Sequence, residues 1–216
     1  MIFGLPSCIM TTPAIVLVQT PEMKMSDLFP VFLKLNKRRV LIVGGGKMAA
    51  RRVQQLVRAG AVVTVVAPKI CTEIEELAKA GSVNLIRRAF ERADLSSRYF
   101  IVIAATNKPA VQKGVFQEAK RCRILCNIVD NPRYCNFYTP AVVKRGDLKI
   151  AVNTSGRSPS LAGIVRQYLE EAIPENVADL TTTVGILRSR LKSDIPGDLK
   201  RQKKLVREFV EKALKR

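Results

Sequence analysis

Short apolar runs and amphipathic stretches alternate along the middle of the chain. The apolar runs span residues 40–43, 62–66, 83–86, 99–103 and 124–129. The first run, a glycine turn, a helical stretch and the second run fit into about 30 residues, the length of a βαβ unit. Such a unit places its two strands parallel in one sheet. The pattern therefore predicts a doubly wound α/β domain, Rossmann-like in architecture, that ends near Thr139.

The helices expected between these strands have recognisable faces and starts. The first follows Gly46, places Met48, Leu56 and Val57 on one face and ends at Gly60. The residues expected to mark the starts of two further helices are a capping box, Thr72 and Glu75, and the pair Asn107 and Pro109 in the cap and first-turn positions.

The pattern changes beyond residue 140. Two apolar runs, 141–143 and 148–152, flank a short polar turn and predict a β-hairpin. A helix is expected to begin at Ser158-Pro159 and to stop at Pro174. From Asp198 onward, apolar residues recur at helical spacing among many Lys and Arg, which predicts an amphipathic helix in the C-terminal tail.

Composition sets the class of protein. Of the 216 residues, 47% are hydrophobic and 25% are charged, so the chain can bury a core and is not mainly disordered. No apolar run approaches the roughly 20 residues that span a bilayer, which excludes an integral membrane protein. Residues 1–25 hold several prolines, no helical periodicity and no basic start of a signal peptide. We expect this extension to be disordered and assign it no function.

Two residue types restrict the chemistry. The chain has no histidine, which excludes Ser-His-Asp hydrolysis, Cys-His proteolysis and histidine-ligated zinc. Five cysteines without a Cys-x-x-Cys pair argue against a disulfide framework or a cysteine zinc site, so no metal site is expected and a cytoplasmic location fits best. The cysteines are Cys8, Cys71, Cys122, Cys126 and Cys135. Buried, inert thiols are the favoured interpretation of Cys122 and Cys126.

The chain is strongly basic. Lys and Arg number 37 and Asp and Glu 18, so 37 − 18 gives a net charge of +19. Such a charge indicates an anionic partner, which can be nucleic acid, a membrane surface or a polyanionic small molecule. The basic tail lacks the interleaved aromatic residues of single-strand binders, and a solvated helix face explains it more simply.

A glycine motif stands where nucleotide-binding proteins carry one. Gly44-x-Gly46-x-x-Ala49 follows a predicted strand and opens a predicted helix, so its backbone can approach a pyrophosphate at the helix N-terminus. A plain tight turn between strand and helix is the alternative. The second strand leads into Lys69 rather than the acidic residue that usually binds a ribose 2′-hydroxyl. Lys69 can instead accept a 2′-phosphate, so the choice between NAD and NADP stays open.

Three more segments follow predicted strands and carry candidate chemistry. Thr106-Asn107 lies at the carboxyl edge of the fourth strand, although Asn107 can equally be a simple helix cap. Asp130, just past the fifth strand, can act as a general base in the same crevice, whereas its spacing before Asn-Pro also fits a turn. The loop 153–159 offers Thr154, Ser155, Arg157 and Ser158 as an anion site, with an N-cap loop as the alternative.

Six motifs taken together resemble one family. They are Val-Leu-Ile-Val-Gly-Gly-Gly46-x-Met-Ala, Ala-Gly-Ala61, Val-Val-Ala-Pro68, Ala-Ala-Thr-Asn107, Cys-Asn-Ile-Val-Asp-Asn-Pro132 and Gly-Arg-Ser-Pro159. In this order and at these separations they are similar to the precorrin-2 dehydrogenases of siroheme synthesis, including the N-terminal module of siroheme synthases and the yeast-type bifunctional enzyme. The match runs from about Asp27 to the helix before Pro174. The resemblance implies a Rossmann domain at 26–139, a dimerisation region at 140–174 and a small helical domain at 175–216.

The resemblance also implies roles for particular residues. NAD⁺ would be bound by Gly44, Gly46, Lys47, Met48, Pro68, Lys69, Thr106 and Asn107. Asp130 matches the family's key carboxylate, and Thr154 a serine-or-threonine position beside the substrate, with Ser155, Arg157 and Ser158 in the same loop. That loop departs from the more usual Ser-Thr-Gly-Gly at Asn153 and Ser155.

The implied activity is NAD-dependent dehydrogenation of precorrin-2 to sirohydrochlorin by a homodimer. Hydride would pass from the macrocycle to the nicotinamide, with proton loss assisted by Asp130. The carboxylates of the tetrapyrrole suit a chain of charge +19, without any need for nucleic acid or a membrane. Insertion of Fe²⁺ by the same carboxylate is a second activity that some relatives have and others lack. The alternatives are a non-catalytic NAD-sensing or nucleic-acid-binding module, and a different Rossmann oxidoreductase acting on a small anionic metabolite.

Overall fold

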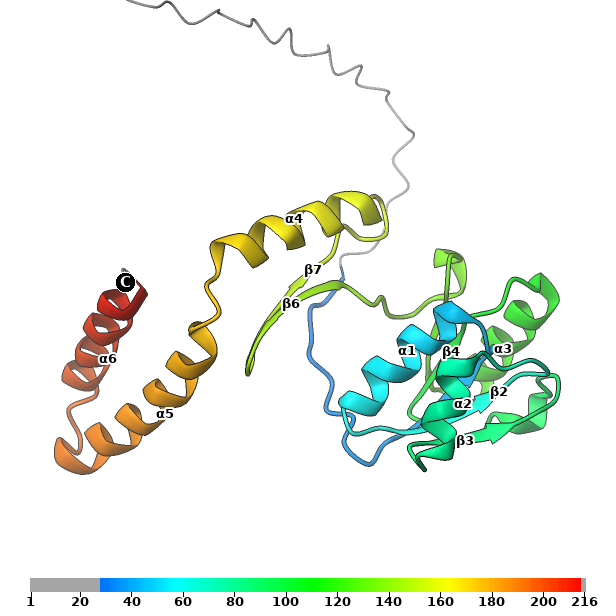
Figure 1. Ribbon diagram of the computed structural model, residues 1–216, viewed down its shortest axis with the longest axis horizontal. Coiled ribbons are helices and arrows are strands. Elements are labelled where there is room, and N and C mark those ends of the chain that lie inside the picture. Colours follow the sequence, from blue (N-terminus) through cyan, green and yellow to red (C-terminus); the bar gives the residue numbers. More distant parts are fainter. Residues whose placement is uncertain (1–27, 215–216) are drawn as a thin grey trace, which may run out of the picture.

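The computed structural model describes residues 28–214 (Figure 1). Its larger sheet has the strand order β3-β2-β1-β4-β5, and neighbouring strands run parallel. The strands are β1 (Arg39–Val43), β2 (Val62–Val66), β3 (Val83–Ile86), β4 (Ile101–Ala104) and β5 (Leu125–Ile128). The prediction of a doubly wound parallel sheet is confirmed.

Helices cover both faces of this sheet because successive strand residues point to opposite sides. The covering helices are α1 (Lys47–Arg58), α2 (Thr72–Lys79) and α3 (Pro109–Cys122). Val40 and Ile42 of β1 pack in one core cluster with α1 and α2, whereas Leu41 packs in the other with α3. All three side chains are fully buried, and each such burial contributes about 1.5–3 kcal/mol. Packing on both faces fixes the sheet, and with it the edge at which the carboxyl ends of the strands lie.

The predicted capping box of α2 is wrong. The helix begins at Thr72 and its N-cap is Cys71, without a side-chain hydrogen bond at the cap. The Glu75 carboxylate instead accepts a hydrogen bond from Arg87 Nη1 at 2.8 Å. An ion pair with the segment after β3 is therefore what Glu75 makes in place of a local cap.

The predicted cap of α3 is also one residue too early. Pro109 occupies the first turn as expected, but the N-cap is Lys108 rather than Asn107. A proline with its fixed φ suits the first helical position, so the residue directly before it becomes the cap. Asn107 is thereby left exposed in the loop that follows β4.

The remainder of the described chain forms a hairpin and three helices. The sequence pattern predicts the hairpin, the first helix and the last; the middle helix lies in the small helical domain that the resemblance implies. The elements are β6 (Ala141–Arg145), β7 (Leu148–Val152), α4 (Pro159–Ala172), α5 (Val177–Asp194) and α6 (Leu199–Leu214). β6 and β7 are antiparallel, and Ser158 caps α4 by accepting a hydrogen bond from Leu161 N at 3.3 Å. Figure 1 shows the hairpin and α4 between the large sheet and the α5–α6 pair.

Several expectations are not settled by the fold. The domain boundaries at 139/140 and 174/175 stay predictions, although β6 does begin at Ala141. The extension 1–25 and Cys8 lie outside the described residues.

Within residues 28–214, no helix combines the length and the apolar character that a bilayer crossing requires. In the same range, no three His, Cys, Asp or Glu side chains gather as a metal site would need.

Candidate functional site: a nucleotide cavity with one carboxylate

The strand order creates a crevice at the carboxyl ends of β1 and β4. The chain moves from β1 toward β2 and β3 on one side, then crosses to β4 and β5 on the other. Ligands of open α/β sheets bind at such a switch point. A cavity of about 800 Å³ lies here, between the glycine turn after β1 and the loops after β2, β3, β4 and β5.

The glycine turn has no room for side chains at its first two positions. Gly44 has φ +123°, and a Cβ there would lie 2.2 Å from the carbonyl oxygen of Ala105. A Cβ on Gly45 would lie 2.1 Å from the carbonyl oxygen of Lys69. The turn therefore packs directly against the backbones that follow β4 and β2.

The third glycine faces open space, and the residues around it fit a pyrophosphate. Gly46 is the N-cap of α1, and a Cβ there would meet no atom within 4 Å. The first turn of α1 carries no acidic residue, so its free N–H groups and the helix dipole favour an anion. Lys47, Lys69 and Lys108 add positive charge to the cavity wall.

The cavity brings together nine of the thirteen predicted site residues. They are Gly44, Gly46, Lys47, Met48, Pro68, Lys69, Thr106, Asn107 and Asp130. The sequence pattern placed Met48 on one face of α1 with Leu56, but Leu56 is buried whereas Met48 is 43% exposed. The other buried residues of α1 are Ala49, Ala50 and Val53. The same exposure makes Met48 available to a ligand.

Asp130 enters the cavity from a turn after β5. Its φ is +62°, a left-handed conformation that Asp tolerates better than most residues. Asn131 N donates to Ile128 O at 3.2 Å and closes the turn, and Val129 N donates to Ala104 O at 2.9 Å. Asp130 thus forms the turn that its spacing suggested, and as an exposed residue it also lines the cavity. Its role as a general base stays a prediction.

Arg52 is a neighbour of Asp130 that the sequence analysis missed. It stands one turn after Met48 on the same side of α1, and its buried Nε has no hydrogen-bond partner within the part of the chain described. Burial lowers the pKa of Arg52, and the negative charge of Asp130 acts in the opposite direction. The spacing of four residues from Met48 is the signal that could have placed Arg52 at this site.

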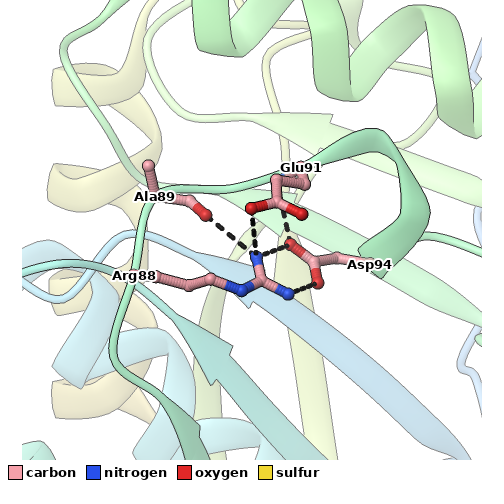
Figure 2. A network of polar contacts seen from close by, with 4 residues as sticks. All are labelled: Arg88, Ala89, Glu91 and Asp94. Carbon is pink, nitrogen blue, oxygen red and sulfur yellow. Dashed lines mark hydrogen bonds and ion pairs between the residues drawn. The ribbon is translucent and has the colours of Figure 1, made fainter.

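The loop after β3 supplies a second wall that the sequence did not reveal. Figure 2 shows Arg88 bound bidentately to Asp94, with distances of 2.8 and 2.6 Å. Arg88 Nη1 also donates to Ala89 O at 3.0 Å, and Glu91 N donates to Asp94 Oδ2 at 2.8 Å. This network closes the loop around Phe90, which lines the cavity together with Ala89.

The Arg88 network also fixes the charge of Asp94. Its side chain is only 5% exposed, and burial alone would raise its pKa. The hydrogen bonds from Arg88 and from the backbone of Glu91 outweigh burial and hold the pKa of Asp94 below its ordinary value. The loop is consequently tied by an ionised carboxylate at neutral pH.

The loop 153–159 does not line the cavity in this chain. Thr154 Oγ1 donates to Ser158 O at 2.9 Å and accepts from Ser158 N at 3.1 Å. Arg157 N donates to Thr154 O at 3.0 Å, and Ser155 N to Asn153 Oδ1 at 2.5 Å. The segment forms the capping loop of α4, and its contact with substrate stays a prediction.

The two predicted buried thiols differ. Cys126 is 1% exposed, and burial, with Cys135 nearby, raises its pKa to about 12, so the thiol stays protonated. Cys122 is only partly buried, which corrects the expectation. Its position in the last turn of α3 leaves the sulfur within 3.6 Å of the exposed Arg121 and of the buried Glu118.

Comparison with known proteins agrees with this geometry. A family model described as putative NAD(P)-binding matches residues 31–141. A solved structure of SirC, a precorrin-2 dehydrogenase, is 31% identical, has a TM-score of 0.71 and is matched over 85% of this chain and 89% of that one. The chain belongs to the precorrin-2 dehydrogenase family. The glycine turn, the Asp130 turn and the hairpin with α4 all lie within the span shared with members of this family.

Curated relatives of the family are longer proteins. The siroheme synthase of Baumannia cicadellinicola is 39% identical over 169 residues, and that of Sodalis glossinidius 38% identical over 188 residues. These matches cover 78% and 87% of this chain but 36% and 39% of the two relatives. The chain therefore spans less than half the length of these two siroheme synthases.

Proposed function

We propose that the protein oxidises precorrin-2 to sirohydrochlorin with NAD⁺ as the electron acceptor. The observation that carries the proposal is the placement of Asp130 in the same cavity as the glycine turn and the open N-terminus of α1. A carboxylate beside a candidate dinucleotide site, in a chain of the precorrin-2 dehydrogenase family, supports this proposal.

Binding of the cofactor is assigned to the residues that line the cavity. The N–H groups at Gly46 and Lys47 would hold the pyrophosphate, and Pro68 and Lys69, which line the same cavity, would contact the adenosine. Thr106 and Asn107, which follow β4 and also line the cavity, would contact the nicotinamide. When bound, NAD⁺ accepts a hydride at the nicotinamide C4.

We assign to Asp130 the acceptance of the proton that the macrocycle loses. Loss of a hydride and a proton from the macrocycle removes two electrons and two hydrogens, which balances formation of NADH and H⁺. The exposed Asp130 carboxylate accepts the proton and passes it to solvent. The positive charge of Arg52 lies near this carboxylate.

Substrate and partners follow from charge and exposed surface. Precorrin-2 carries acetate and propionate groups, which a chain of charge +19 attracts. We assign Thr154, Ser155, Arg157 and Ser158 to its carboxylates. Leu161, Ile164 and Tyr168 on α4 are 52%, 49% and 69% exposed, which supports a homodimer that covers this helix. The second protomer would then help to enclose the substrate.

The test is anaerobic incubation of the purified protein with precorrin-2 and NAD⁺, followed by absorbance of sirohydrochlorin. The variant Asp130→Asn keeps the shape of the side chain but cannot accept the proton, and we expect it to lose formation of sirohydrochlorin. Asp179→Asn, at an exposed position on α5, is the matched control and retains activity. Fe²⁺ added after oxidation shows whether the protein also forms siroheme, the second proposed activity.

A wild-type protein that folds and binds NAD⁺ but forms no sirohydrochlorin would reject the proposal. The alternative, a non-catalytic NAD-sensing or nucleic-acid-binding module, would then be tested through salt-sensitive binding to DNA.

A further inference from the structure

Gln112 makes two hydrogen bonds that join separate parts of the cavity wall. It lies in the first turns of α3 and lines the cavity. Its Nε2 donates to the carbonyl oxygen of Thr106 at 2.7 Å, and its Oε1 accepts from Asn131 Nδ2 at 3.2 Å. One side-chain amide therefore connects the loop after β4 with the residue that follows Asp130.

The backbone alone does not hold these two loops together beyond the ends of their strands. β4 and β5 pair up to Ala104 and Ile128, and Val129 N still donates to Ala104 O at 2.9 Å. After that point one chain turns into α3 and the other into the Asp130 turn. In the part of the chain that the structure describes, Gln112 is the side chain whose hydrogen bonds join the two loops past this point.

The Asp130 turn depends on its neighbours for its shape. A left-handed conformation is unfavourable for a non-glycine residue, so surrounding contacts must maintain it. Cys135 contacts the backbone on both sides of this turn. Its Sγ accepts from Ile128 N at 3.2 Å and lies 3.3 Å from Asn131 O. Within residues 28–214, the Gln112 amide is the contact that holds the Asn131 side chain from the cavity side.

We propose that Gln112 is a positioning residue that fixes Asp130 relative to the Thr106–Asn107 loop, and so relative to the nicotinamide end of the cofactor. The inference rests on the proposed function. Both ends of the amide are needed, since the nitrogen can only donate and the oxygen accepts from Asn131. Gln112 touches neither the transferred hydride nor the proton; it acts through the separation of the groups that do.

The expected effect is on turnover rather than on cofactor binding. Misplacement of a reacting group by 1 Å can cost about 100-fold in rate, so we expect Gln112→Met to lower kcat by about 10- to 100-fold. Methionine keeps the length and helix preference of glutamine, and both hydrogen bonds are lost. The Kd for NAD⁺ changes by no more than about threefold, because the glycine turn is untouched. Gln117→Met, at an exposed position on the same helix, is the matched control and keeps wild-type kcat.

A double-mutant cycle with Asn131→Ala distinguishes positioning from general loosening of the fold. If the two side chains act through their mutual hydrogen bond, the double variant loses no more kcat than the worse of the single variants. Losses in kcat that multiply would instead show two independent effects and overturn the inference, as would unchanged turnover in Gln112→Met. If the wild-type protein shows no turnover, the proposed function is overturned, and the inference with it. If the wild-type protein turns over and Gln112→Met has the same kcat, the inference alone is overturned.

Discussion

The glycine turn makes the sharpest prediction, because neighbouring glycines differ in what surrounds them. Gly44→Ala forces a Cβ to within 2.2 Å of the Ala105 carbonyl oxygen at a residue with φ +123°. Gly46→Ala adds the same methyl group at φ −88°, with no atom within 4 Å. One chemical change is thus predicted to act on folding at the first position and on ligand binding at the other.

The magnitudes follow from those distances. At Gly44, an unfavourable backbone conformation costs about 1–3 kcal/mol and displacement of packed backbone costs about as much again, giving about 4 kcal/mol in all. At a urea m-value of about 2 kcal/mol/M, the unfolding midpoint falls by about 2 M. At Gly46, loss of glycine at the N-cap and lower entropy of the unfolded chain nearly cancel, so the free energy of unfolding changes by less than about 1 kcal/mol.

Urea denaturation and calorimetric titration with NAD⁺ measure the two effects separately. Gly46→Ala should unfold near the wild-type midpoint yet bind NAD⁺ at least about tenfold more weakly, which corresponds to about 1.4 kcal/mol, because its methyl group occupies the space where the backbone approaches the pyrophosphate. The reasoning is refuted by a Gly44→Ala protein of wild-type stability, or by a Gly46→Ala protein of wild-type affinity.

Three more predictions concern the residues around this turn. Asp94→Asn weakens the bidentate contact with Arg88 and raises the Kd for NAD⁺. The pKa of Asp94 is depressed in the folded state. The stability that its carboxylate adds is therefore present above about pH 4 and is lost at lower pH. Urea melts at pH 7 and pH 3 check this, and a stability gap from wild type that is undiminished at pH 3 contradicts it. Cys126, buried with a pKa of about 12, resists iodoacetamide at pH 8 while the partly exposed Cys122 reacts faster; mass spectrometry showing equal rates would disprove this. Lys69→Glu weakens NADP⁺ binding more than NAD⁺ binding, and equal losses in calorimetric titrations would remove Lys69 from the adenosine end.

The sequence predicted the sheet because its signals were strong and local. The runs 40–43 and 62–66 consist almost entirely of apolar residues, which is typical of buried parallel strands. The glycine turn and helical stretch between them predict a βαβ unit. Residues at the ends of such strands converge at one edge by topology alone. The glycine turn, Lys69, the Thr106-Asn107 pair and Asp130 could therefore be found without coordinates.

The errors concern choices between competing local interactions. Thr72 and Glu75 have the spacing of a capping box, but Arg87, twelve residues after Glu75, offers a stronger charged partner. Met48 has the hydrophobicity of a core residue, yet smaller alanines fit the close approach of α1 to the sheet. These outcomes depend on tertiary distances that a pattern along the chain does not contain.

The residues that the sequence missed act through contacts between separate loops. Arg88 and Asp94 are ordinary charged residues until the loop brings them to 2.6 Å and closes around Phe90. Gln112 is one of many helical glutamines, and its role depends on partners six residues before it and nineteen after it. Polarity identifies neither, because charged and amide side chains are common on exposed helices and loops.

The most direct test of the central claim is the stoichiometry of the anaerobic reaction with limiting precorrin-2 and excess NAD⁺. The account predicts one NADH formed for each sirohydrochlorin by the wild-type protein, and neither product from Asp130→Asn, although this variant binds NAD⁺ with wild-type affinity. Sirohydrochlorin formed without NADH, or full turnover by Asp130→Asn, would contradict the claim that this cavity joins a dinucleotide site to its catalytic carboxylate.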